Sequence, residues 1–117
     1  MHASPLVKKF QYAWAGLKAA VVREQSLRIQ SLAGIVVVVT GAVVGLTRLE
    51  WAFVVAAVGA VLSLELVNSA VEKALDLLHP HEHEQVRFVK DVLAAAVLLA
   101  SLAAAVIGLL IFLPHVL

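Results

Sequence analysis

The sequence predicts an all-α integral membrane protein, in which an N-terminal amphipathic surface helix is followed by three transmembrane helices. Three long apolar runs alternate with short charged stretches along the chain. Hydrophobic residues make up 62% of the 117 residues and charged residues 15%, against about 25% charged residues in ordinary soluble domains. A soluble domain of this size could not bury so much apolar surface. We therefore expect one membrane domain that covers residues 1–117.

Several function classes are excluded by what the chain lacks. It has no cysteine, which excludes disulfides, a thiolate nucleophile and a cysteine-ligated metal. It has no phosphate-binding loop, dinucleotide fingerprint or nucleophile elbow, and its net charge of +1 gives no reason to expect a nucleic-acid partner. The first 28 residues carry five Lys or Arg and no apolar core, so we expect no cleavable signal peptide.

Residues 5–28 are predicted to form the surface helix. Pro5 suits a first helical turn, and the basic residues lie away from a narrow apolar stripe. Such a helix suits the lipid headgroup layer, although a soluble helix packed on the rest of the protein has the same pattern. Glu24 lies near the apolar face. One explanation is a charge-paired turn between two helices, with Arg23 or Arg28 as its partner, and the other is a functional role. The apolar stripe consists of Phe10, Trp14, Leu17 and Val21.

The first two spans are expected at about residues 31–47 and 51–72. In lipid the backbone must satisfy its own hydrogen bonds, so both runs are predicted as helices. Gly41 and Gly45 are spaced for a close approach between helices. A tight turn over residues 47–51 is expected to join the two spans.

The second helix is expected to run past the membrane. From Trp51 to Leu78 it has about 28 residues, or about 42 Å, whereas the hydrocarbon core is about 30 Å thick. Its last turns should therefore emerge on the side of the N-terminus, and Pro80 ends it. The third span is expected at about residues 92–113, where an alanine-rich run permits tight helix contacts and ends before Pro114.

Basic residues predict the orientation. The N-terminal segment holds five Lys or Arg and residues 73–90 hold three, whereas the first loop holds only Arg48 and the C-terminus none. The positive-inside rule places the N-terminus and the second loop in the cytoplasm and the C-terminus outside. We therefore expect a multi-pass protein of the cell inner (plasma) membrane. The second loop carries alternating histidines, for which a metal site is one interpretation and a solvated turn the favoured one. They are His79, His81 and His83.

A polar stripe on the second span carries the chemistry. Glu65, Asn68, Glu72 and Asp76 are spaced 3, 4 and 4 residues apart, within an arc of about 80° on one helix face. Carboxylates in a membrane helix are costly and usually line a functional interior. Hard divalent cations bind carboxylates together with substrate phosphates, and a carboxylate can take a proton from an alcohol. On spacing alone, phosphoryl transfer, proton or cation transport, and a packing role remain open.

Several separated blocks resemble the small prokaryotic diacylglycerol kinase/undecaprenol kinase family, in the family's order and at its intervals. The resemblance covers about residues 10–113. The blocks are residues 12–18 (YAWAGLK), 24–28 (EQSLR), 65–72 (ELVNSAVE) with Asp76, and 89–91 (VKD).

The resemblance implies a homotrimeric lipid kinase with three spans and with active sites between subunits. It implies that ATP and Mg²⁺ serve to phosphorylate the hydroxyl of a membrane lipid. It implies that Glu65 is the general base, that Asn68 orients groups in the site, and that Glu24 and Glu72 hold the metal ions. The implied nucleotide-binding residues are Tyr12, Glu24, Glu72, Asp76, His83, Lys90 and Asp91. The implied lipid-substrate residues are Trp14, Gly16, Arg28, Gln30 and Glu65.

The lipid is the open part of this resemblance. Residues 48–51 (RLEW) and 64–68 (LELVN) are more similar to the undecaprenol kinase branch, so undecaprenol is the expected substrate and diacylglycerol the alternative. The chain departs from the family in the alternating His and Glu of residues 79–84 and in Gln30, where some members carry an acid. Either Lys8 or Lys9 fits the family's N-terminal basic residue. A non-enzymatic membrane protein, either an ion pathway or a scaffold, is the other hypothesis.

Overall fold

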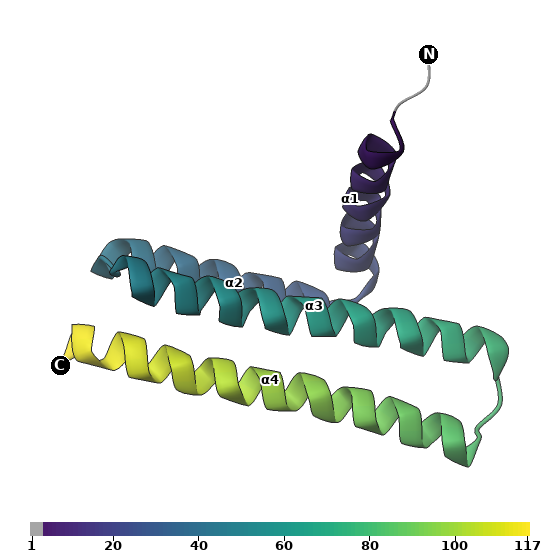
Figure 1. Ribbon diagram of the computed structural model, residues 1–117. Helices are drawn as coiled ribbons and strands as arrows, with labels where there is room; N and C mark the ends of the chain where they lie inside the picture. Colours follow the sequence, from purple (N-terminus) through teal and green to yellow (C-terminus); the bar gives the residue numbers. More distant parts are fainter. Residues whose placement is uncertain (1–3) are drawn as a thin grey trace.

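The fold consists of four helices, which the computed structural model describes within residues 4–117. They are α1 (Pro5–Arg23), α2 (Gln25–Val44), α3 (Arg48–Leu78) and α4 (Glu84–Val116). Helices α2, α3 and α4 lie side by side, and α1 runs across their direction from the start of α2 (Figure 1). Each of these three is long and apolar enough to cross a membrane. The predicted all-α, multi-pass membrane protein with three candidate spans is therefore confirmed.

The end of α1 corrects one prediction. The sequence pattern predicts a single helix over residues 5–28, but Glu24 leaves the helical backbone (φ −108°, ψ 115°) and separates α1 from α2. The Arg28 side chain folds back across the break, where its Nη1 donates hydrogen bonds to the carbonyl oxygens of Val21 at 3.1 Å and Val22 at 2.6 Å. Carbonyls in the last turn of a helix lack helical donors, so these contacts stabilise the break.

The turn between α2 and α3 is shorter than predicted. Gly45 ends α2 with a positive φ of 78°, and Thr47 caps α3. Thr47 Oγ1 accepts a hydrogen bond from the Glu50 backbone N–H at 3.2 Å, and the Glu50 carboxylate accepts one from the Thr47 backbone N–H at 2.9 Å. This reciprocal pair is a capping box, which fixes the start of a helix. Residues 48–51 therefore form the first turn of α3 rather than part of the turn before it.

Two buried glycines let α2 approach its neighbours closely. A Cβ added at Gly34 would lie 3.0 Å from Val58 Cγ1, and one at Gly41 would lie 2.9 Å from Trp51 Cη2. Both contacts are with α3. The predicted close-approach pair is therefore correct for Gly41, whereas Gly45 serves the turn.

Helix α4 also continues past its predicted end. The helix includes Pro114 and runs to Val116, and the Leu117 N–H donates to the Leu113 carbonyl at 2.9 Å. Pro114 lies in the last turn, so its missing N–H removes little of the hydrogen-bond ladder. His115 Nε2 lies 3.1 Å from a Glu50 carboxylate oxygen, which joins the end of α4 to the start of α3.

Few side chains are buried within one copy of the chain. Most large apolar side chains are exposed, as expected for helices that face lipid or further copies. Most of the buried side chains belong to α3 and lie on a single stripe of that helix. The stripe is apolar in its first half and polar in its second half. The stripe consists of Val54, Val61, Glu65 and Ser69. The fold thus turns the Glu65 carboxylate into the bundle rather than outward.

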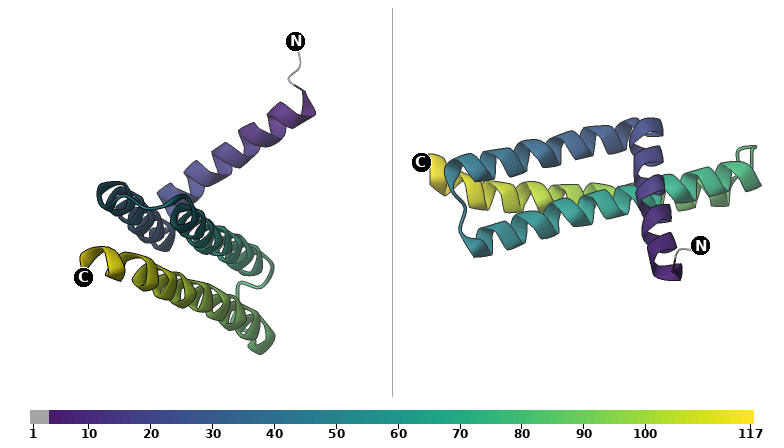
Figure 2. Two further views of the ribbon diagram at one scale, coloured as in Figure 1. Left: turned by 60° about the vertical axis from the view of Figure 1, so that its left-hand side comes forward. Right: turned by 90° about the horizontal axis from the view of Figure 1, so that it is seen from above.

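Helix α3 is longer than a bilayer core. Its 31 residues span about 46 Å, against a hydrocarbon thickness of about 30 Å. Figure 2 shows the end of α3 that leads into α4 extending past the level where α1 crosses the bundle. At that crossing Gly16 and Ala20 of α1 border the same cavity as Ser69 and Lys73 of α3. The polar stripe therefore lies around the level of α1.

Candidate active site

Glu65 is buried in the bundle and accepts a hydrogen bond there. Only 5% of its surface is exposed. Ser26, in the first turn of α2, donates its hydroxyl to Glu65 Oε1 at 2.7 Å. The carboxylate thus lies beside the N-terminal turn of α2, where the helix dipole favours a negative charge. Helix α3 supplies the acid of this contact, and α2 supplies the donor that fixes it.

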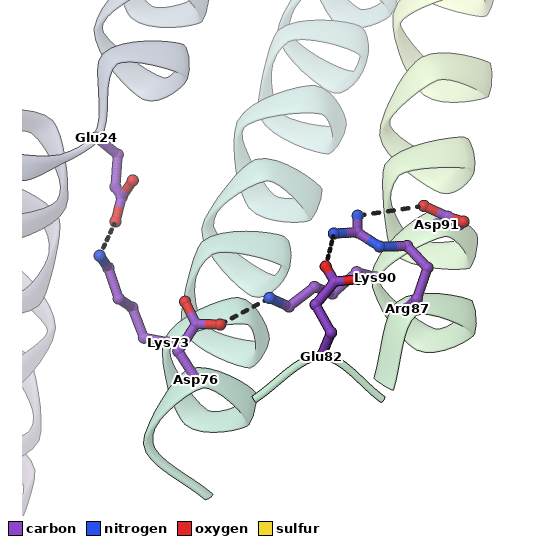
Figure 3. Close-up of polar contacts among 7 residues, drawn as sticks. All are labelled: Glu24, Lys73, Asp76, Glu82, Arg87, Lys90 and Asp91. Carbon is purple, nitrogen blue, oxygen red and sulfur yellow. Dashed lines mark hydrogen bonds and ion pairs between the residues drawn. The ribbon is translucent and has the colours of Figure 1, made fainter. Parts of the chain in front are cut away.

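Glu24 and Lys73 link the α1–α2 junction to α3. Lys73 Nζ lies 3.8 Å from Glu24 Oε1, as Figure 3 shows. A cavity of about 430 Å³ lies between α1 and α3 beside this pair. Gly16 and Leu66 contribute to its apolar walls, whereas Glu24 and Lys73 place charges on its lining. An apolar pocket with a few polar groups suits an amphipathic ligand.

Asn68 and Glu72 are available for a further partner. Asn68 Oδ1 is buried and has no hydrogen-bond partner among the described residues. Glu72 lies one helical turn further along α3 and is half-buried. A buried polar atom without a partner is costly, so the amide oxygen fits a site that a ligand or another copy completes. Within residues 4–117, no group of three or more His, Asp or Glu side chains is placed to hold a metal ion.

Asp76 and Lys90 join α3 to α4 near the loop between them. Lys90 Nζ lies 2.6 Å from Asp76 Oδ1 (Figure 3). Arg87 lies one turn earlier on α4, at 3.5 Å from Glu82 and 3.7 Å from Asp91. This end of the bundle therefore presents alternating acidic and basic groups, with ammonium and guanidinium donors that suit phosphate oxygens.

Residues 11–112 match the family described as "Prokaryotic diacylglycerol kinase". The chain belongs to this family. An undecaprenol kinase from Bacillus subtilis is 34% identical over 107 residues, which cover 92% of this chain and 87% of the relative. A diacylglycerol kinase from Synechocystis is 34% identical over 116 residues, which cover 98% of this chain and 66% of the relative. A diacylglycerol kinase from Escherichia coli (strain K12) is 28% identical over 110 residues, 94% of this chain and 90% of the relative.

As a member of the prokaryotic diacylglycerol kinase family, the chain is a lipid kinase. Family membership implies ATP as the phosphate donor and a membrane lipid as the acceptor. The non-enzymatic hypothesis, an ion pathway or a scaffold, is therefore set aside. A lipid kinase needs a base for the lipid hydroxyl and a cation for the phosphates. The buried Glu65 and the paired Lys90 are the candidates for these two roles.

The loop of this kinase that carries the histidines caps a helix. His83 precedes the first residue of α4, and its Nδ1 accepts a hydrogen bond from the Gln85 backbone N–H at 3.1 Å. The rings of His79 and His83 are tilted toward each other at a centroid distance of 6.2 Å. The loop residues are exposed, and no metal-binding group is found among the described residues. Within the described residues, the hydrogen bond that a histidine ring of this loop makes is therefore the His83 cap of α4.

The predicted lipid residues are distributed over three helices, because Glu65 lies on α3 and the others on α1 and α2. On α1, Trp14 is exposed, and Lys18 Nζ lies 6.0 Å from its ring centroid. Tyr12, expected as a nucleotide contact, is exposed on the same helix. Gly16 lines the cavity between α1 and α3, whereas Gln30 lines a second cavity among α2, α3 and α4. The guanidinium of Arg28 is held by the α1 carbonyls described above, so within one copy Arg28 has a structural contact.

Two site neighbours were missed by the sequence reasoning. Ser26 contacts Glu65, which is 39 residues away in the sequence. Lys73 of α3 pairs with Glu24 at the break between α1 and α2. No spacing rule connects residues on different helices. The one available signal for Lys73 is its place directly after Glu72 in the sequence, beside the polar stripe.

Proposed function

We propose that this kinase transfers the γ-phosphate of ATP to undecaprenol in a Mg²⁺-dependent reaction. Two features support undecaprenol over diacylglycerol. The B. subtilis relative, similar over most of both chains, is named undecaprenol kinase. Residues 48–51 and 64–68 also resemble that branch. Diacylglycerol remains the alternative acceptor, because relatives of comparable identity are named diacylglycerol kinases.

The observation that carries the proposal is the buried Glu65 carboxylate at the level of the surface helix. A lipid alcohol keeps its chain in the bilayer, since exposing each CH₂ to water costs about 0.8 kcal/mol. The general base must therefore be brought to the membrane surface. Glu65 would take the proton of the lipid hydroxyl, and Asn68 beside it would orient the reacting groups.

The metal assignment rests on the acids around Glu65. Mg²⁺ typically binds one or two protein carboxylates together with substrate phosphates, so a cluster of three acids is not required. Glu24 and Glu72 would be those carboxylates, and the unpartnered Asn68 Oδ1 fits an oxygen-rich site. When bound, the metal would neutralise charge on the triphosphate. The Glu24–Lys73 pair would then have to open or be shared with the phosphates.

The nucleotide would bind at the end of the bundle where α3 and α4 extend beyond α1. Lys90 would contact its phosphates, and Asp76 holds the Lys90 ammonium in place. Asp91, His83 and Tyr12 are proposed as further nucleotide contacts. Trp14, Gly16, Arg28 and Gln30 are proposed around the lipid. This arrangement has the N-terminus and the α3–α4 loop in the cytoplasm and the C-terminus outside.

We also propose that the active sites lie between the subunits of a homotrimer. Glu65 and Asp76 are eleven residues apart on α3, or about 16 Å along the helix. The Lys90 ammonium is held at Asp76, so in one copy it lies far from the Glu65 carboxylate. The γ-phosphate must approach the lipid hydroxyl at Glu65 to about 3–3.5 Å, and a triphosphate held by Lys90 of the same copy would have to span that separation, which favours a site that takes these groups from different copies.

The test is a competition between undecaprenol and diacylglycerol for phosphate from labelled ATP, with purified protein in mixed micelles. We expect labelled undecaprenyl phosphate to dominate and labelling to stop when EDTA removes Mg²⁺. Preferential labelling of diacylglycerol would contradict the lipid assignment, and labelling that survives chelation would contradict the metal assignment.

A further inference from the structure

We propose that Ser26 is a positioning residue of this kinase, whose hydroxyl holds the Glu65 carboxylate in the orientation for proton transfer. The inference rests on the proposed function, in which Glu65 is the general base. Ser26 belongs to a different helix from the base, and neither the polar stripe nor the residues proposed above include it.

The first argument is the contact itself. Ser26 Oγ donates to Glu65 Oε1 at 2.7 Å, and this is the one hydrogen bond to the Glu65 side chain among residues 4–117. The distance is that of a well-formed hydrogen bond from a hydroxyl to a carboxyl oxygen. With Oε1 held by the serine, Oε2 is the oxygen left free to accept the proton of an alcohol.

The second argument is that Ser26 itself cannot shift easily. The next residue, Leu27, is fully buried (0% exposed) and anchors the first turn of α2 in the bundle. Arg28 follows and binds the carbonyls of Val21 and Val22 at the end of α1. The donor is thus fixed by both neighbouring contacts. A glutamate side chain loses rotamer freedom when one oxygen is fixed in this way, which prepares it for reaction.

The third argument is the chemical type of the donor. Residues 92–114 of α4 and 29–44 of α2 carry no charged side chain, so those faces offer Glu65 no ion-pair partner. A cation in contact with the carboxylate would stabilise its charged form strongly and weaken it as a base, whereas a neutral hydroxyl orients it with a smaller effect. The charged residues nearest in sequence to Ser26 and Glu65 are Glu24, Arg28, Glu72 and Lys73.

The test measures kcat and KM of purified wild-type protein, Ser26→Ala, Ser26→Thr and Ser31→Ala, with undecaprenol and Mg-ATP varied separately. Ser26→Ala should lower kcat by about tenfold and leave both KM values within about twofold of wild type. Ser26→Thr keeps the hydroxyl and should recover most of kcat. Ser31→Ala makes the same chemical change on another face of α2 and should match wild type. Thermal unfolding in detergent, measured for each variant, separates these effects from misfolding.

Each other outcome overturns the proposal. An unchanged kcat in Ser26→Ala, beside a Glu65→Gln variant that is inactive, contradicts the role of Ser26 alone. Equal losses in the alanine and threonine variants would indicate a structural role, and a rise in KM alone would make Ser26 a substrate contact. Wild-type protein that phosphorylates neither undecaprenol nor diacylglycerol, or a Glu65→Gln variant as fast as wild type, contradicts the proposed function and the role of Ser26 with it.

Discussion

Lys90, the proposed phosphate contact, is already held in place within one copy of the chain. Its side chain is only 21% exposed, and its ammonium is held 2.6 Å from Asp76 on the neighbouring helix. Because an ammonium has further N–H donors beyond the one this pair uses, it can still bind phosphate oxygens. If the nucleotide binds here as proposed, the charge is fixed in position before it arrives, which would lower the entropy cost of binding.

Replacing Lys90 by alanine should therefore weaken nucleotide binding. A hydrogen bond to a charged group contributes about 1.5–3 kcal/mol, so we expect KM for ATP to rise by about tenfold to a hundredfold. Arg48→Ala removes a cation from the opposite end of α3 and serves as the control. Steady-state kinetics with ATP varied at saturating lipid provides the measurement, and equal KM values for Lys90→Ala and Arg48→Ala would refute the phosphate contact.

At the scale of the elements, the sequence predicts the helices better than their ends. Long apolar runs predict spans because lipid forces the backbone to bond to itself, and the spacing of Glu65, Asn68 and Glu72 places them on one face of α3. A turn at Glu24 is one interpretation that the sequence offers, but the contacts that stabilise the break are not predictable from it. Glu24 pairs with Lys73 of α3, and the Arg28 side chain acts across the turn. Contacts between helices, such as that of Ser26 with Glu65, leave no periodic signal.

The close approach of α2 to α3 at Gly41 gives a stability prediction. A side chain at this position would meet Trp51 Cη2 at 2.9 Å and Leu46 Cδ1 at 2.8 Å, so Gly41→Val overpacks the contact. We expect a loss of about 1–3 kcal/mol in stability, observed as a lower thermal midpoint in detergent. Gly59→Val is the matched control, because a Cβ there meets nothing within 4 Å. Equal midpoints for the two variants would show that the glycine contact is not required.

At the scale of the whole molecule, one copy of the chain is thin and leaves most of its helix surface uncovered. Its extents are 52 × 48 × 20 Å, and most of its large apolar side chains are exposed. Lipid can cover such faces, and so can further copies of the chain. Lys90 is held at Asp76, which lies about 16 Å from Glu65 along α3, and this separation within one chain is the reason to propose further copies.

Mixing two defective variants tests this expectation. Co-expressed Glu65→Gln and Lys90→Ala chains should together recover activity at limiting ATP, because a mixed trimer can combine an intact Glu65 with an intact Lys90. If subunits mix at random, about a quarter of the sites regain both groups. Glu65→Gln mixed with Glu65→Ala is the control and should recover nothing. Activity no higher than that of either variant alone would place the whole site within one chain.

The most direct test of the account is the rate of phosphate transfer by the Glu65→Gln variant at saturating lipid and Mg-ATP. Glutamine keeps the size of the side chain and can still accept the Ser26 hydrogen bond, but it cannot take a proton. General base catalysis contributes about a hundredfold to ten-thousandfold, so we expect kcat to fall within that range while KM for ATP stays near the wild-type value. A Glu65→Gln variant that keeps kcat within a few-fold of wild type would contradict the assignment on which the rest depends.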